Sequence, residues 1–190
     1  MAFTVPEKWY EPVQDHDDIK IIQHPPGSGY IHPASTVEVR CFLADLLPEI
    51  IPPELQIIQL SSITRKRDRE PLYGMQWGCA VYLYPQGENL IEEYTVAPKP
   101  EHKQVTEKYG GHWHNRQNGK WTLIWKKIEQ LRDFYLHNVL MHEIGHAHDN
   151  RNTTPRKREQ FANAFAIEHG DRPYTQDKKK GRVHKRHHNI

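Results

Sequence analysis

The sequence predicts an α+β fold in which a helix and several short strands are followed by two further helices. β-branched and aromatic runs between Pro and Gly residues occupy residues 55–60, 78–96 and 120–125, as is typical of strands. Apolar side chains and histidines then repeat at a 3.6-residue period as far as residue 146. Residues 159–166 carry a second helical pattern. The expected order is therefore helix, strand, hairpin, strand, helix and helix.

Length and composition favour one domain. The chain has 190 residues, of which only 36% are hydrophobic, and its 14 prolines predict long surface loops and frayed ends. No apolar run is long enough for a membrane helix, and the N-terminus lacks a signal-peptide pattern. Cys41 and Cys79 are the only cysteines, so neither a disulfide framework nor a four-cysteine metal site is expected. We therefore expect a cytoplasmic protein.

Residues 1–33 are rich in Pro, Gly, Asp and His, and we expect an irregular segment with one short strand at 19–22. This segment is either extended and wrapped on the domain, or it is a pro-segment that covers a substrate cleft. In the second case His24 or Cys41 would reach a metal ion.

A capping box at Ser35 and Glu38 predicts the start of the first helix, which continues through an apolar run to Pro48. A strand is expected at 55–60 and a solvated charged loop at 65–70. Residues 78–84 and 90–96 then favour a β-hairpin around a short loop.

Residues 98–111 are polar and are expected to form a loop. His112 and His114 share one face of an extended segment, where they either bind a metal ion or are simply exposed. Asn118-Gly119 predicts a turn into a strand at 120–125, although a helix competes there. The next helix is expected to begin between Trp125 and Leu131.

That helix carries a His-Glu-x-x-His pattern. Residues four apart lie on one face of a helix, so His142 and His146 can bind one metal ion. Glu143 follows the first histidine, where it can reach a water molecule on the open side of the metal. There it would act as a general base, because zinc lowers the pKa of that water.

A third ligand is expected on the following helix. Residues 150–155 predict a turn, with Thr153 or Thr154 as the cap and Pro155 in the first helical turn. If the two helices fold back on each other, Glu159 comes level with the two histidines. Two histidines, one glutamate and a water complete a tetrahedral catalytic zinc site.

These two segments resemble the gluzincin-type zinc metallopeptidases, most closely the ImmA/IrrE-like peptidases and the catalytic domain of anthrax lethal factor. The resemblance rests on His-Glu-x-x-His followed by Glu-x-x-Ala-Asn-x-Phe-Ala, about 30 residues in all. It implies that His142, His146 and Glu159 bind zinc and that Glu143 is the general base. Asp149 matches an acidic residue after the second ligand. Asn163 takes the place of a carboxylate that orients a ligand histidine.

The chain departs from these families in two respects. The spacer between His146 and Glu159 is shorter, and it lacks the tyrosine that lethal factor places just before its third ligand. The group that stabilises the transition state is therefore unassigned, with His169 a weak candidate for oxyanion support. A metzincin site is excluded, because Asp149 and Asn152 stand where its glycine and third histidine would be.

The resemblance further implies a minimal zincin-like domain over residues 34–172, with a small, twisted, mostly antiparallel sheet packed on the metal helix. The edge strand of such a sheet takes the substrate backbone as an added strand. The expected function is that of a zinc-dependent endopeptidase acting on a protein or peptide substrate.

Residues 173–190 form a basic tail that we expect to be disordered. Its stretch 178–188 either attracts nucleic acid and acidic surfaces or only aids solubility. An alternative function is thus a nucleic-acid-associated protein with a structural or vestigial zinc site. A peptidase recruited by the tail would combine both functions. A structural zinc site usually has four protein ligands, and His148 points to another face of the helix than His146.

Overall fold

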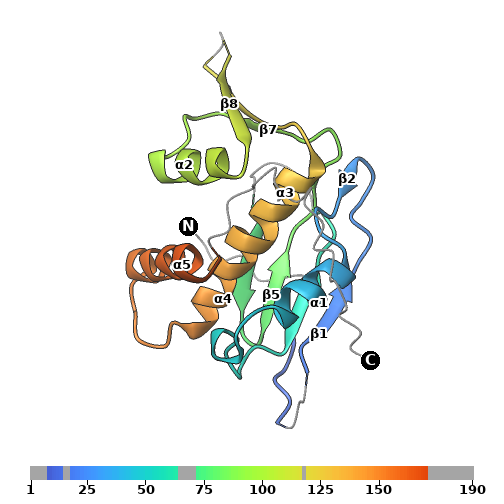
Figure 1. The fold of residues 1–190 in the computed structure, drawn as a ribbon, viewed down its shortest axis with the longest axis vertical. Helices are drawn as coiled ribbons and strands as arrows, with labels where there is room; N and C mark the ends of the chain where they lie inside the picture. The colour runs from blue at the N-terminus through green and yellow to red at the C-terminus, as the bar shows by residue number, and fades with distance from the viewer. Residues whose placement is uncertain (1–7, 15–17, 64–71, 117–118, 171–190) are drawn as a thin grey trace, which may run out of the picture.

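The computed structural model describes residues 8–14, 18–63, 72–116 and 119–170, and it has an α+β fold (Figure 1). The loop expected at 65–70 and the basic tail at 173–190 lie outside the described residues.

A four-stranded sheet in the order β1–β3–β5–β4 forms the base of the fold. Its strands are β1 (Lys20–Gln23), β3 (Ile57–Leu60), β5 (Ala80–Leu83) and β4 (Gly74–Trp77). The first three are parallel, and only the edge strand β4 is antiparallel to its neighbour. The prediction of a mostly antiparallel sheet beside the metal helix is therefore wrong.

Helix α1 (Thr36–Ala44) lies between β1 and β3 in the chain, and a parallel pair needs such a crossover connection. The strands expected near 19–22 and 55–60 are confirmed. The capping box is also confirmed, because Ser35 Oγ accepts from the Glu38 backbone N–H, and Glu38 Oε2 accepts from the Ser35 backbone N–H. A short 3₁₀ turn, η1 (Pro48–Ile50), follows the helix.

The predicted hairpin between residues 78–84 and 90–96 is wrong. Strand β5 instead forms a hairpin with β4, joined by Gly78 and Cys79, and the φ of Gly78 is +58°. Strand β7 (Ile91–Tyr94) pairs with β9 (Trp121–Trp125), which also pairs with β8 (Gly111–Asn115). The strand predicted at 120–125 is thus confirmed, in a second, antiparallel sheet.

The loop predicted at 98–111 is also wrong for most of its length, because helix α2 (Pro100–Lys108) occupies it. Proline suits the first position of a helix, because a backbone N–H at that position would have no hydrogen-bond partner within the helix. The helix buries only Thr106, so it has no apolar stripe by which the sequence could reveal it. A short pair, β2 (Tyr30–Ile31) with β6 (Gln86–Gly87), completes the strands of the described residues.

One long helical stretch carries the His-Glu-x-x-His pattern. It consists of α3 (Ile128–Phe134), a π-helical segment η2 (Tyr135–Leu140) and α4 (Met141–His148). It begins within the window predicted between Trp125 and Leu131. Helix α5 (Pro155–Gly170) then runs back beside it, as expected (Figure 1).

Two clusters of buried side chains hold these layers together. The larger lies between the helices and one face of the four-stranded sheet, and it includes Ile58, Val81, Leu131 and Ile144. The smaller lies on the opposite face, where Tyr10 packs against Tyr82 and other side chains.

Of the N-terminal segment, residues 8–14 lie along this second face of the sheet. Tyr10 Oη donates to Gln59, Tyr82 Oη donates to the Lys8 carbonyl, and Val13 exchanges two hydrogen bonds with the Gln56 side chain. These residues therefore wrap the domain on the face opposite α4, rather than covering that helix.

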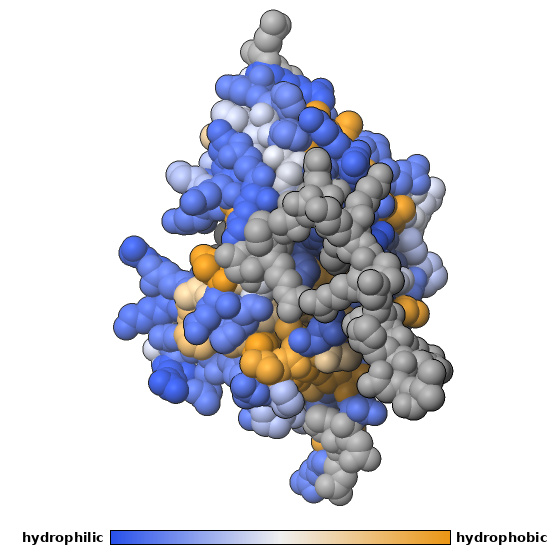
Figure 2. All heavy atoms as spheres, viewed as in Figure 1, coloured by the Kyte–Doolittle hydropathy of each residue, from blue (hydrophilic) through white to orange (hydrophobic). Residues whose placement is uncertain are grey.

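Figure 2 shows mostly hydrophilic side chains around α2 and β8, and apolar side chains gathered over α1 and the segment that follows it. Val37 and Leu47 are exposed large apolar residues in that part of the chain. Among the described residues, no helix has the length and apolar character needed to cross a membrane.

Candidate metal centre

Close packing of two helices builds the site. Gly145 on α4 has no side chain, and a β-carbon added there would lie 3.0 Å from both the Ala162 Cα and the Phe165 Cβ on α5. Ala162 and Ala166 are fully buried in this contact. Because small residues face each other, α5 approaches the backbone of α4 and brings Glu159 opposite the two histidines.

The turn before α5 follows the sequence pattern. Pro155 is the first residue of α5, and Thr154 Oγ1 accepts from the Lys157 backbone N–H at 3.4 Å. The helix therefore starts one turn before Glu159, which leaves that side chain free to reach α4.

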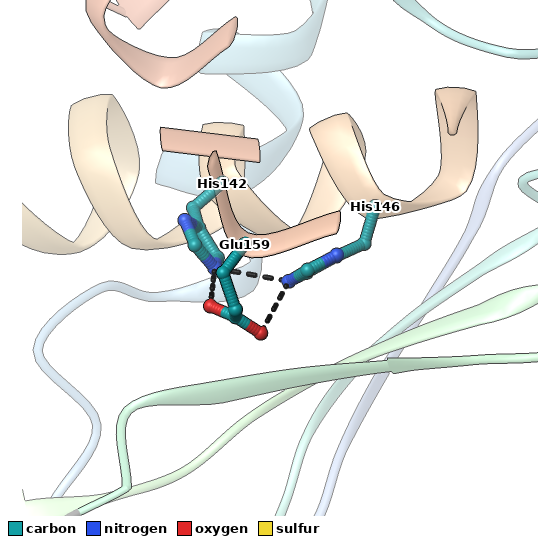
Figure 3. Close-up of side chains that lie close together, drawn as sticks. All are labelled: His142, His146 and Glu159. Atoms are coloured by element: carbon teal, nitrogen blue, oxygen red, sulfur yellow. Dashed lines mark hydrogen bonds and ion pairs between the residues drawn. The ribbon is translucent and has the colours of Figure 1, made fainter. Parts of the chain in front are cut away.

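Three side chains converge at the site (Figure 3). The Nε2 atoms of His142 and His146 are 3.0 Å apart. Glu159 Oε2 lies 3.4 Å from His142 Nε2, and Glu159 Oε1 lies 3.4 Å from His146 Nε2. Within the part of the chain that the structure describes, this is the one group of three or more His, Cys, Asp or Glu side chains so arranged.

These separations fit one tetrahedral ion. Zinc binds imidazole nitrogen and carboxylate oxygen at about 2.0–2.2 Å, so ligand atoms around a tetrahedral zinc ion lie about 3.3–3.6 Å apart. The observed 3.0–3.4 Å is close to that spacing. Two histidines and one carboxylate are also a donor set that zinc prefers.

The charges at the site favour a cation between the three groups. Hydrogen bonds with His142 and His146 hold the pKa of Glu159 well below its usual range. Burial alone would lower the pKa of His142, but hydrogen bonding to Glu159 and the charges of Glu143 and Glu159 outweigh it and raise this pKa. The carboxylates therefore stabilise positive charge where the two rings meet.

Glu143 lies between α4 and the edge strand β4, and only 7% of it is exposed. Burial raises the pKa of its carboxyl group, while the neighbouring histidines and a hydrogen bond from the Gln76 backbone oppose that rise. A buried carboxyl group with a raised pKa is a better proton acceptor than an ordinary surface glutamate.

Two residues were expected to support the ligands. Asn163, one turn after Glu159, lies close enough to His142 for its side chain to help raise the pKa of that imidazole. Asp149 ends α4, and its Oδ1 accepts from the backbone N–H and the side-chain amide of Asn152. Among the described residues, Asp149 Oδ2 and His146 Nδ1 are buried without a hydrogen-bond partner. A role for Asp149 in orienting a histidine stays a prediction.

The remaining candidates lie elsewhere. His169 packs on Phe165 and is ten residues beyond Glu159, about 15 Å along the helix. His148 Nε2 contacts the Ile50 carbonyl at 2.7 Å. None of four other candidates joins the group: His112, His114 and Cys41 are exposed, and the carbonyl of His24 contacts the His32 ring.

No pattern in the sequence indicated the contribution of β4. Gly74 and Gln76 lie directly against Glu143, although they are nearly 70 residues away in the chain. A four-residue strand that begins with glycine has too weak a pattern for detection.

Comparisons with protein-family models, with curated proteins and with solved structures found no match to this chain.

Proposed function

We propose that this protein is a zinc-dependent peptidase that hydrolyses peptide bonds in a protein substrate. His142, His146 and Glu159 would hold the zinc ion, and Glu143 would be the general base. The observation that carries the proposal is the convergence of three ligating side chains beside a fourth, buried carboxyl group.

The number of ligands supports a catalytic rather than a structural site. Structural zinc sites are closed by four protein ligands, whereas catalytic sites have three and keep one position open. Three ligating side chains meet here, and 61% of the Glu159 side chain is exposed. Solvent and substrate can thus reach the group.

When bound, zinc would lower the pKa of a water molecule and polarise the carbonyl of the scissile bond. Glu143 would accept the proton of that water as it attacks, and would then pass it to the leaving amine. Asn163 would hold the His142 ring in the orientation that binding requires.

The edge of β4 would bind the substrate backbone. The Tyr84 backbone N–H donates to the Tyr73 carbonyl, so Tyr73 is paired inward to β5. Because pairing alternates along an antiparallel strand, the backbone groups of Gly74 and Gln76 face outward, and of these the Gln76 N–H is already directed at Glu143. An extended peptide can add to such an edge through its own backbone, which suits an enzyme that cleaves within a chain.

The test is hydrolysis of casein and of a mixed fluorogenic peptide library by the purified protein. We expect cleavage that a zinc chelator abolishes and added zinc restores. Glu143→Gln should bind the same amount of zinc yet lose about 10² to 10⁴ of the rate, because an amide cannot accept the proton. A zinc-loaded protein that cleaves no member of the library, or a Glu143→Gln variant as fast as the parent, would contradict the proposal.

A further inference from the structure

Gly74, the first residue of β4, occupies a position where backbone conformation does not require glycine. Its φ is not in the left-handed region, unlike that of Gly78 in the following turn. Glycine weakens a strand, because it loses more conformational freedom on folding and has no side chain to pack. The reason for glycine at this position must therefore be what lies next to it.

Its neighbour is the carboxyl-bearing side chain of the site. A β-carbon on Gly74 would lie 2.9 Å from Glu143 Cγ and 3.0 Å from Glu143 Oε1. It would also lie 3.0 Å from Cγ1 of Val139, which is one turn earlier on the same helix. Glu143 and Val139 are both more than nine-tenths buried, so neither can turn into solvent to make room.

The same strand also holds the carboxyl group. The backbone of Gln76, two residues after Gly74, also faces Glu143 and opposes the rise in the pKa of its carboxyl group. The side chain of Glu143 thus occupies the space that a residue with a side chain at position 74 would fill.

We propose that Gly74 is a positioning residue for Glu143. By leaving that volume empty, it lets the carboxyl group stay between β4 and α4, beside His142 and His146. This inference rests on the proposed role of Glu143 as proton acceptor, and it adds β4 to the groups on which turnover depends.

Gly74→Ala tests the proposal in the full-length, zinc-loaded protein. We expect its zinc content and KM to stay near those of the parent, because the three ligands are untouched. We expect kcat to fall about 100-fold, because a displacement of a catalytic group by about 1 Å can have an effect of that size. A change that only loosened the fold would instead lower the zinc content or change KM.

Gly87→Ala is the matched control, because it makes the same change in a strand away from the site. A β-carbon there would meet the end of the exposed Asn89 side chain, which can turn away. We expect kcat of this variant to equal that of the parent.

A second readout needs no activity. Gly74→Ala should lower the Tm by roughly 5 °C in the parent, as expected for overpacking of a buried site. In a Glu143→Ala background the drop should be clearly smaller, because the nearest obstructing atoms are gone. If Gly74→Ala alone does not fold, we expect the double variant with Glu143→Ala to fold, because the obstructing carboxyl-bearing side chain is then absent.

The outcomes separate the two proposals. A parent that cleaves nothing contradicts the peptidase function, while the Tm comparison still tests the contact between Gly74 and Glu143. An active parent whose Gly74→Ala variant keeps its kcat overturns the positioning role. An equal Tm drop in both backgrounds, or a double variant that also fails to fold, overturns it as well.

Discussion

Asn163 on α5, one turn after Glu159, interacts with His142 on α4 and helps to raise the pKa of that imidazole. The two helices are thus joined at the site by two polar side chains of α5, one facing both histidines and one facing a single ring. Zinc affinity should depend on both, but to different extents.

Asn163→Ala should weaken zinc binding by about 10- to 100-fold, because His142 loses the group that orients it. A competition titration with a chromogenic chelator measures this affinity. Gln160→Ala is the control, since it removes an amide from an exposed position on the same helix. Equal zinc affinity of both variants and the parent would leave Asn163 without this role.

Glu159→Ala should weaken zinc binding more strongly than Asn163→Ala, because it removes a proposed direct ligand. Glu168 lies nine residues further along α5, and Glu168→Ala should bind one zinc ion per chain like the parent. Elemental analysis of the purified variants gives the comparison. Stoichiometric zinc in Glu159→Ala would mean that another group is the third ligand.

Gly145→Ala should lower zinc affinity by about 10-fold. This is the lower end of the range for changes at residues that support a metal ligand without binding the metal. The added β-carbon would press on the Ala162 Cα, so α5 and Glu159 must move away from α4 by a few tenths of an ångström. Alanine is also the better helix former by about 1 kcal/mol, which offsets part of the lost stability.

Calorimetric zinc titration and thermal unfolding of Gly145→Ala separate these two effects. Gly74→Ala is the informative comparison, because it should keep its zinc while losing turnover. An unchanged zinc affinity in Gly145→Ala would show that the helix contact does not control the third ligand.

Glu92 on β7 accepts hydrogen bonds from Tyr73, from Tyr94 at 2.7 Å and from the Trp125 indole at 2.9 Å. An amide has only one acceptor oxygen, so Glu92→Gln leaves at least one buried donor unpaired, at a cost of about 1–3 kcal/mol. We expect its Tm to fall by several degrees. Glu93→Gln, on the exposed neighbour, should change Tm little.

This Tm difference should also depend on pH. Burial raises the pKa of Glu92, although the three donors oppose the rise. A carboxyl group whose pKa is raised on folding contributes most below its unfolded value, near pH 4.5, and loses that contribution as pH rises through the folded value. The Tm advantage of the parent over Glu92→Gln should therefore shrink above pH 4.5. Thermal scans from pH 4.5 to 8 would contradict this if the advantage grew.

Local patterns in the sequence determined several elements and predicted the three side chains that converge at the candidate site. The four-residue spacing of His142 and His146 and the capping box at Ser35 depend on contacts within one helix, so they can be read without knowing the fold. Glu159 could be expected as well, because the short turn before Pro155 allows little choice in how α5 folds back.

Only the tertiary structure decided which strands pair and what lies against Glu143. Residues 78–84 and 90–96 suit a hairpin locally, yet β5 pairs with β3 and β4 while β7 pairs with β9, so the two strands join different sheets. Of these partners, β3 and β9 come from more distant parts of the chain, and strand pairing depends on such neighbours more than on local propensity. Gly74 carries no signal of its own. Its importance follows from the 2.9 Å between its missing β-carbon and Glu143, a contact between segments nearly 70 residues apart that no local pattern encodes.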